Sequence, residues 1–154
     1  MTTHIKNADD IVIRPVEKED DIRSIFNLMQ ELRPNLKEMG EYVDQIFRQI
    51  KSGYKLLVAY QKDLPIGLAG YRFSENTIRG RFVYVDDLVV TSAARGYKVG
   101  EVLLKTVSAE GAKYDCSHLV LDTGIDNKLG QRFYTNFGME PTGLHFSQTI
   151  PNTD

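Results

Sequence analysis

The sequence has no tryptophan, a single cysteine and no long apolar run. Because Cys116 has no partner of its own kind in the chain, no intrachain disulfide and no cysteine-rich zinc site can form. No spacing of histidines and carboxylates indicates another metal site, so we expect none. No segment approaches the roughly 20 apolar residues of a membrane span, and the first residues lack the apolar core of a signal peptide. We therefore expect a soluble, cytoplasmic protein that does not associate with membranes.

A large excess of one charge is also missing. The 19 lysines and arginines nearly balance the 21 aspartates and glutamates, for a net charge of −2. This balance argues against a nucleic-acid partner held by bulk attraction. The hydrophobic fraction of 42% is ordinary for a globular protein, and 154 residues suffice for one core. No repeat or linker interrupts the chain, so we expect one domain over residues 1–154, with its folded core at about 10–150.

The spacing of apolar residues predicts alternating strands and helices. The expected strands lie at 10–16, 54–60, 65–73, 81–90, 118–122 and near 144–150, with a turn at 74–80. The expected helices lie at about 20–32, 39–50, 99–113 and 126–136, and the pair Arg33-Pro34 ends the first of them. Helices spread along the chain in this way predict an α/β domain, with a mixed sheet covered by helices on both faces.

The segment from Tyr84 to Gly100 is the most informative part of the sequence. A buried strand ends in the paired acids Asp86 and Asp87, a glycine-containing loop follows, and an amphipathic helix comes next. A helix N-terminus presents unpaired N–H groups and a positive dipole, so phosphate groups bind there. Neither the P-loop pattern nor the dinucleotide-binding pattern is present. The phosphate-bearing ligand therefore belongs to another class.

Three motifs, taken together, resemble those of the GNAT superfamily of N-acetyltransferases. Arg95–Gly100 resembles the superfamily's pyrophosphate loop, Asn127–Met139 resembles its Asn-x-x-Ala-x-x-Phe-Tyr-x-x-x-Gly signature, and Val85–Val90 resembles the strand before the loop. Within the superfamily, the chain looks closest to the aminoalkylphosphonate and other small-molecule amine N-acetyltransferases. The resemblance implies a single-domain GNAT fold, with a mixed, mostly antiparallel sheet of about six to seven strands. It also implies acetyl-coenzyme A (acetyl-CoA) as the co-substrate.

The resemblance further implies how the coenzyme is held. The backbone of Leu88, Val89 and Val90 would pair with the pantetheine arm and polarise the thioester carbonyl. The residues that resemble the pyrophosphate loop are Arg95, Gly96, Tyr97, Lys98, Val99 and Gly100, and those expected to face the coenzyme from the next helix are Asn127, Gly130 and Phe133. Lys98 stands where the superfamily usually has glycine. It must either take the same turn with its side chain outward or contact a phosphate directly.

Three residues are candidates for the chemistry of acetyl transfer. The resemblance makes Tyr134 the acid that protonates the leaving thiolate; the alternative is a packed aromatic residue with a hydrogen-bonded hydroxyl. Adjacent residues on a regular strand point to opposite faces, so only one of Asp86 and Asp87 faces the amine unless a bulge intervenes. We expect Asp86 to be the base or amine anchor, directly or through water, with Asp87 second. The alternative is a structural carboxylate that meets Arg79, Arg81 or Arg95.

The leading hypothesis is an enzyme that acetylates a primary amine of a small molecule through a ternary complex. Arg79 and Arg81 could attract an anionic acceptor, although a solvated hairpin also explains them. One alternative is acetylation of protein lysines or N-termini. Another is a non-catalytic sensor of acetyl-CoA, but such a protein needs none of the three candidate residues. Since dimers are common among such enzymes, a homodimer is a further expectation.

Overall fold

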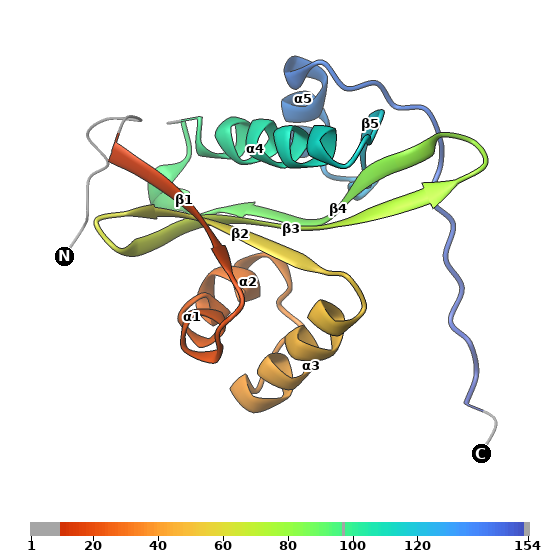
Figure 1. Cartoon of the computed structure of the whole chain (residues 1–154). Helices are drawn as coiled ribbons and strands as arrows, with labels where there is room; N and C mark the ends of the chain where they lie inside the picture. The colour runs from red at the N-terminus through yellow and green to blue at the C-terminus, as the bar shows by residue number, and fades with distance from the viewer. Residues whose placement is uncertain (1–9, 97, 153–154) are drawn as a thin grey trace. The chain divides into compact units, whose positions relative to one another are not determined.

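The computed structural model describes residues 10–96 and 98–152. It divides into two compact units, one up to Leu121 and one from Asp122 onward. The first unit contains, in chain order (Figure 1), β1 (Ile11–Val16), α1 (Glu19–Ser24), α2 (Phe26–Leu32), α3 (Met39–Lys51), β2 (Lys55–Gln61), β3 (Leu64–Asn76), β4 (Gly80–Val90), a 3-10 turn (Ser92–Ala94), α4 (Val99–Lys113) and β5 (His118–Leu121). The second unit contains α5 (Lys128–Phe137). No helix in the described part of the chain is long and apolar enough to cross a membrane.

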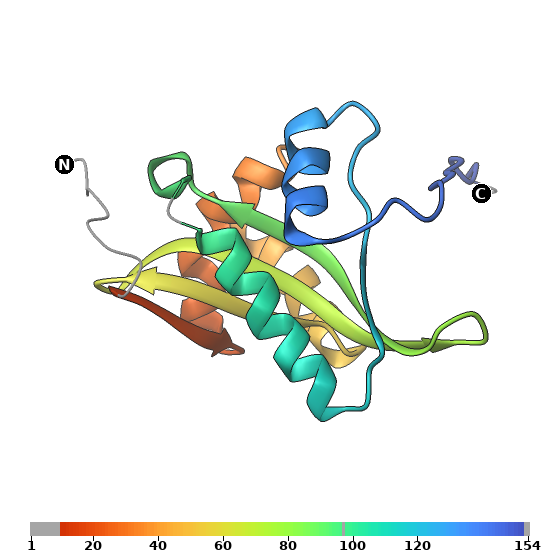
Figure 2. The same ribbon diagram turned by 90° about the horizontal axis from the view of Figure 1, so that it is seen from above.

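The five strands lie in one sheet in the order β1-β2-β3-β4-β5. The first four are antiparallel to their neighbours, and β5 runs parallel to β4. Helices α1, α2 and α3 cover one face of this sheet and α4 covers the other (Figures 1 and 2). The α/β class, the mixed and mostly antiparallel sheet and the helices on both faces are thus confirmed.

The expected strand count of six to seven is wrong, because the sheet has five strands among the described residues. The segment predicted as a strand near 144–150 has no strand among its described residues. Its apolar side chains Leu144, Phe146 and Ile150 are all exposed. Alternation of apolar and polar residues makes a segment suited to a strand, but a strand also needs a neighbour for its backbone groups.

The first predicted helix is divided into α1 and α2. Ile25 stands between them with φ −103° and ψ 8°, outside the helical range, while its side chain is fully buried. Apolar spacing could not reveal this break, since the buried face continues through Ile25 on both sides. The break after Leu32 was predicted correctly from Arg33-Pro34.

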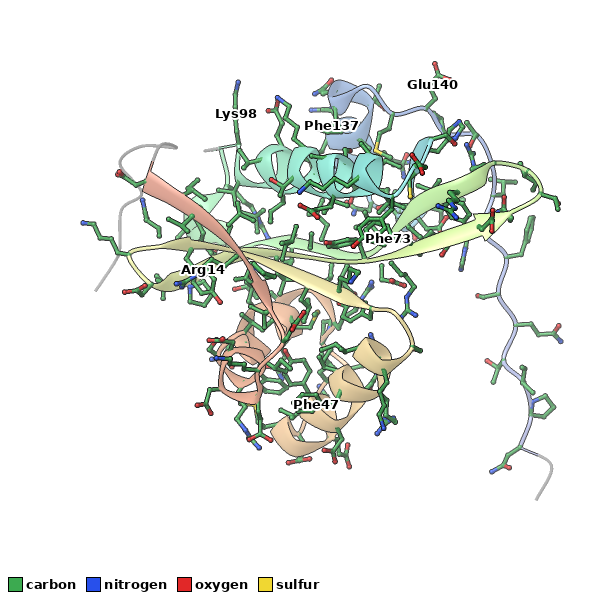
Figure 3. All side chains as sticks on the ribbon, in the orientation of Figure 1. Arg14, Phe47, Phe73, Lys98, Phe137 and Glu140 are labelled. Atoms are coloured by element: carbon green, nitrogen blue, oxygen red, sulfur yellow. The ribbon has the colours of Figure 1, made fainter. Side chains whose placement is uncertain are left out.

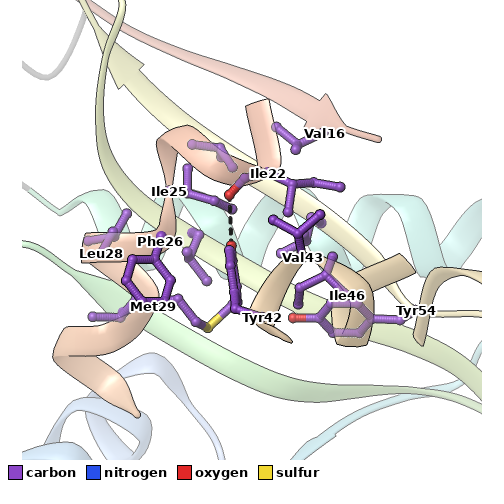
Figure 4. Close-up of a cluster of buried hydrophobic side chains, with 14 of the residues drawn as sticks. Val16, Ile22, Ile25, Phe26, Leu28, Met29, Tyr42, Val43, Ile46 and Tyr54 are labelled. Atoms are coloured by element: carbon purple, nitrogen blue, oxygen red, sulfur yellow. Dashed lines mark hydrogen bonds between the residues drawn. The ribbon is translucent and has the colours of Figure 1, made fainter. Parts of the chain in front are cut away.

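One core fills the space between the sheet and helices α1–α3 (Figure 4). Helix α3 begins where the Glu38 carboxylate accepts hydrogen bonds from the N–H groups of Gly40 and Glu41. Its buried stripe carries Tyr42, whose hydroxyl donates to the carbonyl oxygen of Ile22 at 2.9 Å. This bond ties α3 to α1, so the helical layer is fixed over the sheet.

Helix α4 packs closely on the opposite face. Its buried residues repeat at three- and four-residue spacing: Val99, Leu103, Leu104 and Val107. Two glycines allow the approach. A Cβ atom on Gly111 would collide with Val83, and one on Gly67 would meet Val99 at 3.0 Å. The approach fixes the position of the α4 N-terminus relative to β3 and β4.

Candidate active site

A β-bulge lies in β4 at the two acids. In the ladder with β3, Tyr71 faces Val85 and Gly70 faces Asp87, so Asp86 is the extra residue. On a regular strand the two carboxylates would point to opposite faces. Because of the bulge, Asp86 and Asp87 both line one pocket. The structure therefore brings together the two acids that the sequence left in competition.

This pocket has a volume of about 440 Å³ and lies within the first unit. One wall comes from the end of α2 and the loop after it, with Arg33 and Asn35, and a second comes from α3, with Gln45 and Gln49. The remaining polar side chains in the lining are Arg72 on β3, the two acids on β4 and Tyr42 on α3.

Asp87 is the more enclosed of the two acids, with its side chain 12% exposed. Its Oδ1 accepts a hydrogen bond from Arg33 Nε at 3.1 Å and forms an ion pair with Arg33 Nη2 at 3.0 Å. Its Oδ2 accepts one from the Tyr54 hydroxyl at 2.6 Å. Both oxygens are thus engaged by donors from other elements. The geometry suits a fixed negative anchor.

Asp86 has fewer contacts and is 31% exposed. Arg72 Nε donates to its Oδ2 at 3.0 Å. Burial raises the pKa of the Asp86 carboxyl above its ordinary value, while the hydrogen bond and positive charge of Arg72 oppose that rise. A carboxylate with a raised pKa binds a proton more readily than an ordinary one, which is the property a general base needs.

Tyr54 positions Asp87 and depends on a glycine to do so. The Tyr54 side chain is almost fully buried, and burial together with the Asp87 charge raises the pKa of its phenol well above the ordinary value. The hydroxyl therefore stays protonated and donates a hydrogen bond to the Asp87 carboxylate. A Cβ atom on residue 70 would collide with the Tyr54 ring and hydroxyl, so Gly70 makes room for this bond.

Sequence reasoning missed the arginines that pair with the acids. It considered Arg81 and Arg95, among others, but Arg81 lies 4.0 Å from Asp115, and Arg95 donates to the carbonyl oxygen of Val90. Arg33 forms an ion pair with Asp87, and Arg72 forms one with Asp86. The Arg33-Pro34 break placed Arg33 at a helix end, yet nothing in the local sequence shows which distant strand that end meets.

The end of β4 has an open edge beside the acids. Strand β5 pairs with β4 from Phe82 to Val85 only. Leu88, Val89 and Val90 pair with β3 on one side, and no strand in the described part of the chain pairs with them on the other. Alternate residues of an antiparallel strand direct their N–H and C=O groups away from the paired neighbour. The backbone here can therefore accept an extended ligand as an added strand.

The loop between β4 and α4 contains two left-handed residues. Gly96 has φ +92°, and Lys98 has φ +62° and ψ 23°. Lys98 thus takes a turn that glycine would take at lower cost. Its side chain is exposed and points away from the sheet (Figure 3). The left-handed turn and the outward side chain agree with the first alternative for Lys98, and a direct phosphate contact of Lys98 stays untested. Tyr97, also expected to hold the coenzyme, lies outside the described residues.

The N-terminus of α4 has the form of an anion site. Hydrogen bonding along the helix begins with the Val102 N–H, which donates to Lys98 O at 3.0 Å. No side chain in the described part of the chain caps this helix end. The N–H groups of Val99, Gly100 and Glu101 precede that first bond, so they suit an anionic group together with the positive end of the helix dipole.

The second unit contains the remaining candidate residues. Asn127 Oδ1 accepts a hydrogen bond from the Gly130 N–H at 3.0 Å and so caps α5, where a Cβ atom on Gly130 would clash with the Asn127 side chain. The rings of Phe133 and Tyr134 meet edge to face, with centroids 5.4 Å apart. Burial raises the pKa of the Tyr134 phenol. The structure thus gives Asn127 a capping role, and the coenzyme contacts of α5 and the acid role of Tyr134 stay predictions.

Comparison with known sequences agrees with this geometry. The model of the family described as "Acetyltransferase (GNAT) family" matches residues 22–139, more than half of the chain. The chain is 28% identical over 137 residues to the thialysine N-epsilon-acetyltransferase of Bos taurus, covering 80% of this chain and 81% of that protein. It is 27% identical over 150 residues to the glucosamine 6-phosphate N-acetyltransferase 1 of Dictyostelium discoideum, covering 93% of each.

Solved structures extend the comparison to the fold. The chain superposes on an aminoglycoside N-acetyltransferase in complex with CoA with a TM-score of 0.79, covering 91% of this chain and 94% of that one. The two sequences are 18% identical, so this similarity concerns the fold alone.

Proposed function

Because the chain belongs to the acetyltransferase (GNAT) family and is an N-acetyltransferase, we propose that it moves an acetyl group from acetyl-CoA directly to a primary amine of a small molecule, within a ternary complex. The observation that carries this proposal is the bulge in β4, which places two acids in a pocket next to an open strand edge. The acids suit an amine, and the open edge suits the coenzyme arm.

Three parts of the first unit would hold acetyl-CoA. The edge at Leu88–Val90 would pair with the pantetheine arm, and an N–H group of this edge would stabilise the charge that develops on the thioester oxygen. The N–H groups at the start of α4 would bind the pyrophosphate. Gly96 and Lys98 supply the turn that exposes those groups, so Lys98 would contribute its backbone conformation more than its charge.

Asp86 would be the general base. An alkylammonium ion with a pKa near that of lysine, about 10.4, is mostly protonated at neutral pH and must lose a proton before it attacks. Asp86 would take this proton, directly or through a water molecule, while Asp87 attracts the ammonium group. The nitrogen then bonds to the acetyl carbon, the carbon–sulfur bond breaks, and the nitrogen releases its second proton to solvent as the amide forms. Tyr134 would give its hydroxyl proton to the departing thiolate and regain one from solvent.

The acceptor is proposed to be a small molecule because of the pocket's size and the named relatives. A volume of about 440 Å³ lies in the range of ordinary small-molecule sites. Two relatives carry the small-molecule acceptors thialysine and glucosamine 6-phosphate in their names. A peptide acceptor remains the alternative, and the assay below includes one.

Release of free thiol from acetyl-CoA tests the function. The purified chain would be given a panel of amino acids, aminoalkylphosphonates, polyamines, aminoglycosides and a lysine peptide. We expect thiol release with at least one small amine and none without an amine. If the chain binds acetyl-CoA but releases no thiol with any amine, the proposed enzyme function is wrong and the sensor hypothesis takes its place.

Tyr134→Phe tests the acid. We expect turnover to fall about 10²-fold or more, with little change in the dissociation constant for acetyl-CoA, since only the hydroxyl proton is lost. Tyr114→Phe is the control, because it removes a phenol hydroxyl from an exposed residue at the end of α4, outside the candidate site residues. Unchanged turnover in Tyr134→Phe would remove Tyr134 as the acid.

A further inference from the structure

The charges of the pocket that would bind the acceptor are balanced in pairs. Arg33 is paired with Asp87 and Arg72 with Asp86, so the four side chains together carry no net charge. The other polar side chains at the walls are the amides of Asn35, Gln45 and Gln49 and the phenol of Tyr42, which bear no charge. Such a pocket differs from the strongly acidic site that a polycationic acceptor would need.

The balance changes when a protonated amine binds, because it adds one positive charge that the proton transfer to Asp86 does not remove. Once Asp86 has taken the proton of the ammonium group, both the carboxyl and the amine are neutral. Arg33, Arg72 and Asp87 then leave one uncompensated positive charge in the pocket. An anionic group elsewhere on the acceptor restores neutrality, whereas a second ammonium group on the acceptor adds to the imbalance.

Arg33 is the arginine with donors to spare. Its hydrogen bonds use Nε, to Asp87, and Nη2, to the carbonyl oxygen of Asp86. Since a guanidinium has five N–H donors, those on Nη1 are left for a ligand, and the side chain is 47% exposed. Arg72 is less accessible, at 28%, and its guanidinium lies 5.5 Å from the centre of the Tyr54 ring. An incoming anion therefore meets Arg33 first.

From these contacts we propose that the acceptor is a zwitterion: a primary amine on a short chain whose other end carries a carboxylate or phosphonate bound by Arg33. The inference rests on the proposed acetyltransferase function and names the substrate class of the same pocket. The planar guanidinium matches the geometry of either anion. The apolar lining at Met29, Leu36 and Ile46 suits the methylene chain between the two ends.

Matched acceptors test the inference. The values of kcat/KM would be compared for 3-aminopropanoate and its amide, and for 4-aminobutanoate and its amide, with 2-aminoethylphosphonate and propane-1,3-diamine as further arms. Within each pair the chain length is the same and only the anion differs. In at least one pair we expect the kcat/KM of the acid to exceed that of its amide by roughly tenfold or more, or else the kcat/KM of the phosphonate to exceed that of both amides by this factor. The diamine should have the lowest kcat/KM. The carboxylate and phosphonate arms show which anion is preferred.

Variants then locate the anion site. In Arg33→Gln the ratio of acid to amide is expected to fall to about 1, mainly through KM. The ratio cancels any loss of turnover from the weakened contact with Asp87, since both acceptors are measured in the same variant. Arg33→Lys keeps the charge and should restore part of the preference. Arg79→Gln, on the hairpin outside the pocket, should leave the ratio unchanged.

The outcomes separate this inference from the function on which it rests. Turnover of the amides or the diamine at the rate of the acids would overturn the zwitterion and leave the acetyltransferase standing. A preference retained in Arg33→Gln but lost in Arg79→Gln would contradict the assignment to Arg33. Absence of thiol release with every amine would reject the acetyltransferase function, and the inference with it.

Discussion

The two halves of β4 have the same neighbour on one side and differ on the other. From Gly80 to Val85 the strand pairs with β3, and its last four residues also pair with β5, within a continuous ladder. From Asp86 to Val90 it is bulged, pairs with β3 alone and has an open edge in the described part of the chain. Val83 and Val85 are buried, whereas Asp86 and Asp87 line a pocket.

The difference shows where a sheet can carry chemistry. A fully paired strand has its backbone groups engaged, so it contributes stability and little else. Where pairing ends on one side, N–H and C=O groups become available to a ligand, and a bulge redirects side chains at the same point. The first half of β4 therefore supports the second. Substitutions in the two halves are expected to separate stability from activity.

The largest expected effect is that of Asp86→Asn in the second half. The amide keeps the size of the side chain but cannot accept the proton, so kcat should fall about 10²- to 10⁴-fold. The midpoint of thermal unfolding should change little, because the residue is partly exposed and lies in a bulge. Steady-state kinetics and calorimetry on the same preparation would check both. A variant with native kcat would exclude Asp86 as the base.

Val83→Ala is the matching change in the first half. Val83 is 1% exposed and packs against α4 at Gly111. Losing two buried carbon atoms should lower the free energy of unfolding by about 2 kcal/mol, from the transfer and cavity terms together. Activity per folded molecule should persist. Urea unfolding and an assay normalised to folded protein would measure these, and a specific loss of kcat would contradict the division between the halves.

Tyr54→Phe should affect both properties moderately. It removes the hydrogen bond to Asp87, so we expect a loss of about 1–3 kcal/mol in stability, in the range for a buried bond to a charged group. We also expect kcat/KM to fall several-fold, since Arg33 still holds the other carboxylate oxygen. Tyr42→Phe is a suitable control, because that hydroxyl bonds to a backbone carbonyl outside the acid pair. Equal activity losses in the two variants would point to general destabilisation.

The smallest expected effect is a shift in pH dependence caused by Arg72→Gln. Only the carboxylate form of Asp86 can accept a proton, so kcat/KM should rise with pH through the raised pKa of this group. Arg72 lowers that pKa, and removing it should move the rise to higher pH. A profile that stays in place, or moves to lower pH, would contradict Asp86 as the titrating group.

The same pKa has a consequence for stability. The folded state holds the Asp86 proton more tightly than the unfolded chain does. The associated stability is therefore present below the ordinary aspartate pKa and is lost as pH rises through the raised value. Asp86→Asn should remove this part of the pH dependence, which unfolding measured across that range would show.

Much of the fold could be predicted from local sequence, and less of the pocket. Buried stripes such as that of α3 and the stop at Arg33-Pro34 follow from spacing and backbone sterics, so helices and the family could be recognised. The pairing of Arg33 with Asp87 joins residues 54 positions apart, and no local pattern encodes it. The prediction of a strand near 144–150 was wrong, because alternating apolar and polar residues show that a segment suits a strand but do not show that a neighbouring strand is there to pair with it.

The sequence did not predict the bulge itself; it predicted only that both acids could face the same site if a bulge were present. The sequence showed two adjacent acids and required an irregularity if both were to act together. The glycine that accompanies the irregularity, Gly70, lies on the neighbouring strand and is explained by Tyr54, which lies just before β2. Three segments far apart in sequence thus decide the orientation of one carboxylate.

The bulge also makes the site sensitive to a single codon. Asp86 is the one residue of β4 without its own partner on β3. An in-frame deletion of this residue would join Val85 to Asp87 and restore an uninterrupted ladder, so neither half of the strand would have to slip. The deletion variant would keep the sheet and the proposed coenzyme edge while losing the proposed base. The chain is therefore one small deletion away from a form that keeps the proposed coenzyme edge and lacks the proposed base.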